Sequence, residues 1–259
     1  MRIAPLAHPS TRRIGAAVAR AVGSRRAPER TSIRERRPVG SDIDPDAVDA
    51  LLRVGCHLRT LGQFAVRGTT VHDEVIPCGQ KVQISGTMRY LVRATDGLVA
   101  EVHTDRKQRV FYYDGASLTV HAPRMHYYAI VEAPETIGDM LDQVRERHGI
   151  VLPVAELLRW STTHDAVSDL DAARYVGRVC VDGTDTDHFA YRLPEVDWQL
   201  WVARGSALPR RFVVTETAEP CQPQHAATLS WDLAARVDDA AFAFVPPPDT
   251  VRIRLWSAS

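Results

Sequence analysis

The sequence contains little lysine, little cysteine and no long apolar run. Of its 32 basic residues, only Lys81 and Lys107 are lysine. No apolar run approaches the ~18 residues that a membrane-spanning helix needs, so we expect no transmembrane segment. The four cysteines are scattered without a C-x-x-C pair, which argues against a zinc site or a thioredoxin-like motif. We interpret them as free thiols, although one disulfide stays compatible with the spacing of Cys56, Cys78, Cys180 and Cys221.

Charge is distributed unevenly along the chain. Residues 1–37 contain ten Arg and two acids, Glu29 and Glu35, a local charge of +8. The other 222 residues contain 22 basic and 30 acidic side chains, a charge of −8. A body with this excess of acidic residues is unlike a typical nucleic-acid binder, so we predict no nucleic-acid partner. The 45% of hydrophobic residues in the whole chain suffices for a core.

The basic segment at residues 1–42 lacks a lasting hydrophobic period. Thr11-Arg12-Arg13 precedes a short apolar stretch, as in an export signal, but Arg20 interrupts that stretch. We interpret residues 1–42 as a disordered leader or a degenerate signal. The sequence therefore leaves both a periplasmic and a cytoplasmic location open.

The body begins with a helix and continues as strands. Asp44 is a good N-cap with Pro45 at the first helical position, and apolar residues at helical spacing predict a helix over 45–60. From Val82 the apolar residues alternate, as in an antiparallel strand with one wet face. Asp-Gly pairs at residues 96–97 and 114–115 indicate tight turns. We predict strands over 64–76, 82–93, 97–104, 107–114, 117–122 and 125–131.

Helical spacing returns once in the middle of the chain. Residues 134–149 and a shorter segment from Pro153 are predicted helices, the first ending at Gly149. Further strands are predicted over 173–182, 185–193, 196–203, 209–217, 225–234 and 241–245. Helices within an antiparallel meander must cover one of its faces. We therefore predict an α+β fold, a strongly curved sheet whose concave apolar face is covered by the N-terminal helix and a mid-chain helical lid.

Four segments together resemble an uncharacterised bacterial family of predicted periplasmic proteins, domain of unknown function 2092. They are Phe111-Tyr112-Tyr113-Asp114-Gly115, Tyr127-Tyr128-Ala129, Val196-Asp197-Trp198-Gln199-Leu200-Trp201 and Leu208-Pro209-Arg210-Arg211-Phe212-Val213. That family is similar in fold to the LolA/LolB lipoprotein-carrier superfamily. The resemblance implies an open half β-barrel of about eleven antiparallel strands with a lid over an apolar cavity. It also implies a cell-envelope location. We assign the half-barrel to residues 43–248 and a C-terminal tail to 249–259.

Large aromatic and methionine side chains on the strands and lid are the candidate ligand cavity. Aromatic rings bind apolar ligands, and methionine adapts to irregular shapes. The alternative interpretation is an ordinary filled core. The candidate lining residues are Met88, Tyr90, Phe111, Tyr113, Met125, Tyr127, Met140, Leu141, Trp160, Trp198 and Trp231.

No motif that dictates a reaction accompanies these residues. The group Asp182, Asp185, Asp187 and His188 lacks the spacing of a calcium loop, and we interpret it as turn chemistry. We interpret the other polar candidates as surface or capping groups: His121, His126, the His164-Asp165 pair, and Arg204, Arg210 and Arg211. We predict no catalytic residue, no metal and no cofactor.

The leading hypothesis is a monomeric, non-enzymatic cell-envelope carrier or sensor of an apolar ligand. The ligand would be a lipoprotein acyl chain or a lipid, with an envelope protein as a further partner. The alternatives are a protein-interaction module with a filled core and a hydrolase of unrecognised type.

Overall fold

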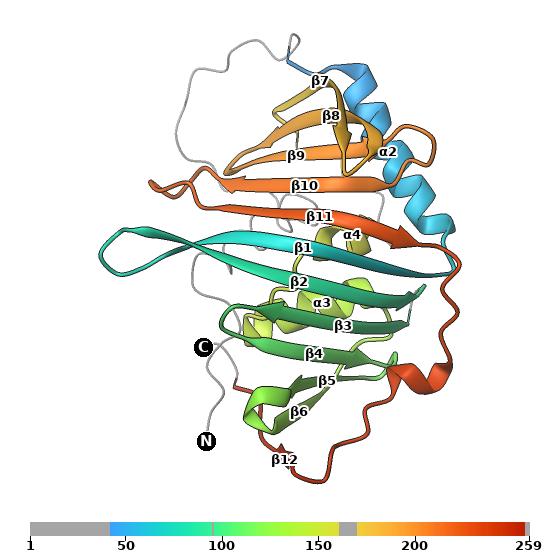
Figure 1. Ribbon diagram of the computed structural model, residues 1–259, viewed down its shortest axis with the longest axis vertical. Helices are drawn as coiled ribbons and strands as arrows, with labels where there is room; N and C mark the ends of the chain where they lie inside the picture. The colour runs from blue at the N-terminus through green and yellow to red at the C-terminus, as the bar shows by residue number, and fades with distance from the viewer. Residues whose placement is uncertain (1–41, 95, 161–169, 257–259) are drawn as a thin grey trace, which may run out of the picture.

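The computed structural model describes residues 42–94, 96–160 and 170–256, which form one open sheet with helices on one face (Figure 1). The leader predicted over residues 1–42 lies almost wholly outside the described residues. Twelve strands run in the order β12-β6-β5-β4-β3-β2-β1-β11-β10-β9-β8-β7. Neither end of this order pairs with the other, so the sheet is not a closed barrel. The predicted open half-barrel with helices on its concave face is confirmed.

Two antiparallel meanders share one seam. The first runs through β1 (Gln63–Val75), β2 (Lys81–Arg93), β3 (Gly97–Thr104), β4 (Gln108–Tyr113), β5 (Ser117–Ala122) and β6 (Tyr127–Glu132). The second runs through β7 (Ala172–Val181), β8 (Thr184–Leu193), β9 (Val196–Ala203), β10 (Pro209–Glu216) and β11 (Gln224–Asp232). Strand β11 then pairs with β1, from Ala65 opposite Asp232 to His72 opposite His225. This late pairing joins both meanders into one surface.

Helix α2 (Pro45–Thr60) covers the β7–β9 end of the concave face (Figure 1). The carboxylate of Asp44 accepts a hydrogen bond from the Asp46 N–H at 2.9 Å, which satisfies one of the free donors of the first turn. The buried stripe includes Leu51, Val54 and Leu58. This is the helix that the apolar spacing predicted, with the same limits.

Helices α3 (Ile137–His148) and α4 (Ala155–Trp160) lie on the same face, behind the middle of the sheet in Figure 1. The Thr136 hydroxyl accepts from the Asp139 N–H at 3.1 Å, and Gly149 ends α3 in the left-handed conformation at φ 61°. Arg159 of α4 forms an ion pair with Asp142 of α3. We refer to residues 134–160 as the lid. No helix among the described residues has the length and apolar character that a bilayer crossing requires.

The C-terminal residues correct two predictions. Residues 241–245 are not a strand, because Asp238 accepts from the Ala240 N–H and starts a short 3-10 helix, η2 (Asp239–Phe242). The predicted tail contains strand β12 (Val251–Arg252), which pairs in parallel with β6. Residues 123–125 form another 3-10 turn, η1, so β6 starts two residues later than predicted.

Gly68 in β1 is required by the close approach of β11. A Cβ added to Gly68 would lie 2.5 Å from the backbone oxygen of Thr228, whereas a Cβ on Gly62 would meet no heavy atom within 4 Å. We expect Gly68→Ala to lower the free energy of unfolding by about 1–3 kcal/mol, because the seam must shift. We expect Gly62→Ala to be neutral. Urea titration of both variants checks this, and equal stability of the two would contradict it.

Candidate functional site

The concave face of the sheet forms the centre of the main core. Alternation turns Met88, Tyr90 and Val92 of β2 toward the helices, whereas their odd-numbered neighbours face away. Seven of the eleven predicted cavity residues lie together in this core and are at most 5% exposed. They are Met88, Tyr90, Phe111, Tyr113, Met140, Leu141 and Trp198. The predicted residues therefore share one apolar face between sheet and lid.

The other four predicted cavity residues are not among the buried residues of this core, or have a side chain that the structure does not describe. Trp231 packs half-buried against the core, and its indole N–H donates to the Pro209 carbonyl at 2.6 Å. Met125 is 41% exposed in η1, and Tyr127 is half-buried at the start of β6. The Trp160 side chain lies outside the described residues. The structure does not bring Met125 and Tyr127 into the core cluster.

Three core tyrosines hold the helical segments against the sheet. The Tyr90 hydroxyl donates to the Pro153 carbonyl at 2.5 Å, and the Tyr113 hydroxyl donates to the Pro134 carbonyl at 2.5 Å. The Tyr191 hydroxyl donates to the Ala47 carbonyl of α2 at 2.9 Å. Burial raises the pKa of Tyr113 and of Tyr191, so both hydroxyls stay protonated donors at neutral pH. The lid is thus hydrogen-bonded to side chains of the apolar face at its start and again between α3 and α4.

A polar cluster that the sequence analysis missed lies toward one end of the concave face. His72 and His225 are opposite each other on β1 and β11, with ring centroids 6.2 Å apart. Glu74 lies two residues further along β1, and its carboxylate is 2.7 Å from the Arg106 guanidinium. Burial, together with the smaller effect of the nearby charge of His72, lowers the pKa of His225 to about 4. The register of β1 against β11 brings these histidines together. They are far apart in the sequence, so no sequence motif could have predicted the pair.

The acidic group around the β7–β8 turn is not assembled into a site. The Asp187 carboxylate accepts from the Tyr175 hydroxyl at 3.1 Å, whereas His188 stacks on Trp201 at 4.0 Å. Neighbours in a strand point to opposite faces, so this carboxylate and this imidazole diverge. No group of three His, Cys, Asp or Glu suited to a metal ion occurs within the described ranges.

The other polar candidates have structural partners. His121 packs against Phe244, with ring centroids 5.1 Å apart, and the His126 ring lies 2.6 Å from the Asp249 carboxylate. The Arg211 guanidinium lies over the ring of Trp201. Arg204 is 3.4 Å from the Asp187 carboxylate. The His164-Asp165 pair is outside the described residues. The four cysteines are free thiols.

A curved, unclosed sheet with a tethered helical lid over one apolar face defines an open half-barrel. The family described as "Predicted periplasmic protein (DUF2092)" matches residues 47–256. The chain belongs to this family, as its aromatic segments predicted. None of the curated proteins matches the sequence.

Several solved structures are similar to this chain at low sequence identity. The lipoprotein LppX of Mycobacterium tuberculosis has 16% identity and a TM-score of 0.47, over 75% of this chain and 100% of that one. LprF from Mycobacterium bovis has 13% identity and a TM-score of 0.40, over 82% and 100% of the two chains. A LolA superfamily protein from Nitrosomonas europaea has 12% identity and a TM-score of 0.36, over 76% and 97%.

The buried His225 makes stability depend on pH. Its folded pKa of about 4 is below the ordinary value of 6.5, so the unfolded chain binds the proton more readily. Between pH of about 6.5 and 4 we expect the free energy of unfolding to fall by about 3 kcal/mol from this group alone. His225→Gln should lose less stability over the same interval than the wild type. Denaturant titrations in that range check this.

The control is His103→Gln, which removes a histidine from the opposite face of the sheet. That variant should keep the wild-type pH dependence. Equal pH dependence of stability in His225→Gln and the wild type would show that His225 is not the titrating group.

Proposed function

We propose that this protein is a non-enzymatic carrier or sensor of an apolar ligand in the cell envelope. The ligand is an acyl chain of a lipoprotein or lipid, bound between the concave face of the sheet and the lid. The observation that carries the proposal is the apolar face bearing Met88 and Phe111, covered by helices rather than by a second sheet. The family description as predicted periplasmic supports the envelope location.

The attachment of the lid suggests how a ligand could enter. The lid backbone begins at Pro134 and reaches α4 after Pro153, and a tyrosine hydroxyl binds the carbonyl of each. A hydrogen bond of this kind contributes about 1 kcal/mol to stability, so both can break at modest cost. Helix α2 is bonded separately, through Tyr191, and need not move with the lid.

An acyl chain can replace the contacts that the lid gives up. Burying a chain of about 14 carbons at ~0.8 kcal/mol per methylene group yields on the order of 10 kcal/mol before binding entropy is counted. Met88 of the sheet and Met140 of α3 are both buried in the core between the sheet and the lid. Flexible thioethers on both walls allow the space between them to take different chain shapes.

Displacement of a fluorescent fatty acid tests the proposal directly. We expect the full chain to bind the probe and Met88→Trp to weaken binding about tenfold, because the larger ring fills the space between sheet and lid. Met125→Trp is the matched control, since the same substitution is made at an exposed position. Met88→Leu conserves volume and should bind as the wild type does.

Mass spectrometry of gently extracted protein gives the identity of any co-purified lipid. If the folded chain carries no lipid and binds no fatty-acid probe, the space between sheet and lid is an ordinary filled core. That result would contradict the carrier proposal.

The tyrosine hydrogen bonds give a second prediction. In the variant Tyr90→Phe/Tyr113→Phe we expect the amides of residues 137–160 to exchange hydrogen about tenfold faster or more, because both lid bonds are lost. Tyr191→Phe is the matched control and should accelerate exchange in α2 instead. Hydrogen-exchange mass spectrometry measures both. Unchanged exchange of the lid in the double variant would show that these bonds do not hold it.

A further inference from the structure

The outer face of the sheet, opposite the lid, is covered on one side only. Residues 237–252, which we call the strap, cross the outer face at β3 to β6 (Figure 1). Phe242 packs against Val99 and Val110, and the Phe244 ring lies 5.1 Å from that of Tyr128. The strap therefore covers the apolar side chains of β3 to β6 on this face and leaves the strands near the seam open.

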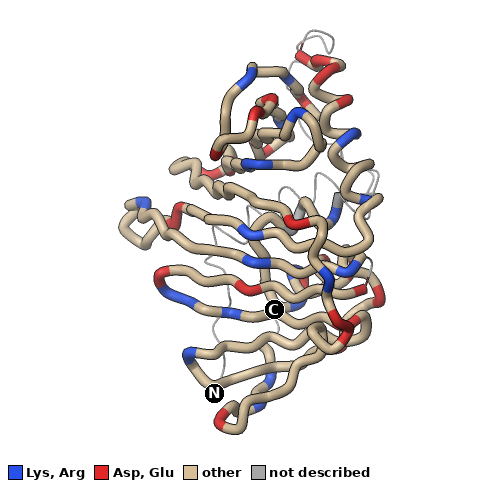
Figure 2. Tube along the Cα trace, turned by 45° about the vertical axis from the view of Figure 1, so that its right-hand side comes forward, with Lys and Arg blue, Asp and Glu red and all other residues tan. Residues whose placement is uncertain are grey.

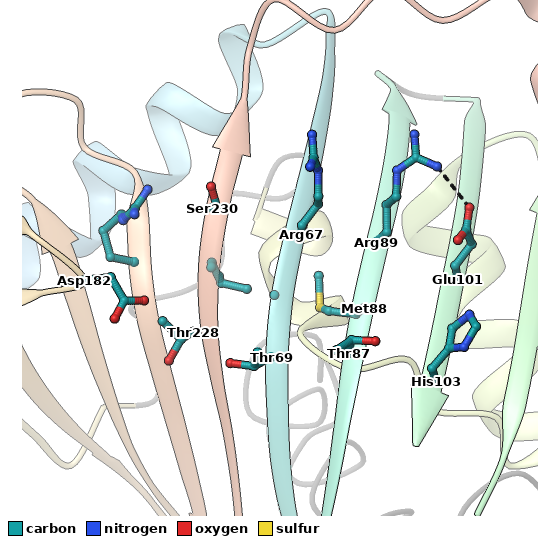
Figure 3. Close-up of a pocket in the computed structure, with 13 residues that line it drawn as sticks. Arg67, Thr69, Thr87, Met88, Arg89, Glu101, His103, Asp182, Thr228 and Ser230 are labelled. Atoms are coloured by element: carbon teal, nitrogen blue, oxygen red, sulfur yellow. Dashed lines mark hydrogen bonds and ion pairs between the residues drawn. The ribbon is translucent and has the colours of Figure 1, made fainter. Parts of the chain in front are cut away.

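A groove of about 510 Å³ occupies the open part, over β11, β1, β2 and β3. Two rows of polar side chains cross these four strands in register (Figure 3). The first row is Ser230, Arg67, Arg89 and Glu101. The second row is Thr228, Thr69, Thr87 and His103. Arg210 and Asp182 complete the rim from β10 and the β7–β8 turn.

The first row places two arginines directly opposite each other. Like charges at directly opposed positions of neighbouring strands are unfavourable. Glu101 offsets one of them, because its carboxylate lies 3.1 Å from the Arg89 guanidinium. Within the described part of the chain, Arg67 has no ion pair and Nε of the half-buried Arg210 has no hydrogen-bond partner. Figure 3 shows that the guanidinium groups of Arg67 and Arg89 project from the same side of the sheet.

The charge of the groove differs from that of the body around it. Arg67, Arg89 and Arg210 outnumber Glu101 and Asp182 there, whereas the chain after residue 37 has eight more acidic than basic residues. Figure 2 shows basic positions in the middle of neighbouring strands of the sheet. A groove that gathers arginines on this otherwise acidic part of the chain presents a local site for an anion.

We propose that this groove binds a phosphate group of a small organic ligand. Arg67 and Arg89 supply forked guanidinium donors that match the oxygens of a phosphate, and Arg210 lies at the rim. The hydroxyls of Thr69, Thr87 and Thr228 add neutral donors in the adjacent row. A phosphate monoester has three terminal oxygens to accept from both rows, whereas a carboxylate has two. The volume is within the range of small-molecule sites.

The groove opens on the face of the sheet opposite the proposed apolar cavity, although the core residues Met88 and Leu229 also border it. Arg67 and Arg89 occupy odd positions of β1 and β2, whereas Met88 and Tyr90 face the lid. The phosphate could belong to a soluble monoester or to the headgroup of an anionic lipid. Both sources present the same oxyanion to the two rows, so the experiment has an arm for each.

Calorimetric titration of the full chain with glycerol 3-phosphate is the first arm. We expect binding that weakens about 100-fold in Arg67→Gln/Arg89→Gln, because two charge-assisted hydrogen bonds are lost. Glu101→Gln should bind several-fold more tightly, since it removes a negative charge beside the site. Arg147→Gln, at an exposed position on α3, is the matched control and should bind as the wild type does.

Flotation with vesicles of phosphatidylcholine containing phosphatidic acid is the second arm. Residues 1–37 carry a charge of +8, so only the binding that Arg67→Gln/Arg89→Gln loses is assigned to the groove. Binding of both probes supports a soluble ligand, and binding of vesicles alone supports a lipid headgroup. The proposal is overturned if neither probe binds, if the double variant binds both as the wild type does, or if succinate binds as tightly as glycerol 3-phosphate.

Discussion

The structure depends on keeping one apolar face of an unclosed sheet away from water. A closed barrel would bury this face by curling on itself, but here β12 and β7 remain separate edges. Helices α2, α3 and α4 must therefore cover the concave side, where most of the core lies. The burial of apolar surface supplies the attraction, and it has no direction of its own. Hydrogen bonds from Tyr90, Tyr113 and Tyr191 supply direction, because each fixes one backbone carbonyl of the covering segments.

The two faces of the sheet are closed in different ways. The lid packs on the concave face through a continuous set of large apolar side chains, and its contacts with the sheet are those of a core. The strap closes part of the outer face with few residues, mainly Phe242 and Phe244. Strand β12 extends that closure around the edge of β6. What the strap leaves uncovered is the polar surface around Arg67, where alternation has placed charged and hydroxyl side chains toward water.

Local sequence patterns predicted most elements but not their pairing. The limits of β3, β5 and β9 were predicted to the residue, because each has alternating or apolar residues bounded by turn residues. The strand expected at 241–245 was wrong, and β12 was missed, because short segments held by edge pairing have no period of their own. The core residues around Met88 were predicted because alternation along each strand identifies the residues that share one face. The histidine pair was not found, since it depends on the β1–β11 register. The tyrosine bonds were missed because they join the sheet to distant helical segments, and the arginine rows were missed because they depend on the register of several strands.

That register places two chemically different surfaces on the same strands. In β2, Met88 and Tyr90 contact the lid layer while Arg89 between them points away, so one backbone separates an apolar face from a cationic one. Side chains on opposite faces do not touch, and a ligand on one side reaches the other only by shifting the strands. Gly68 lies on this seam, where an added Cβ would be only 2.5 Å from the backbone oxygen of Thr228 in β11. The seam thus fixes both surfaces relative to each other, and coupling between them would require movement of β1 against β11.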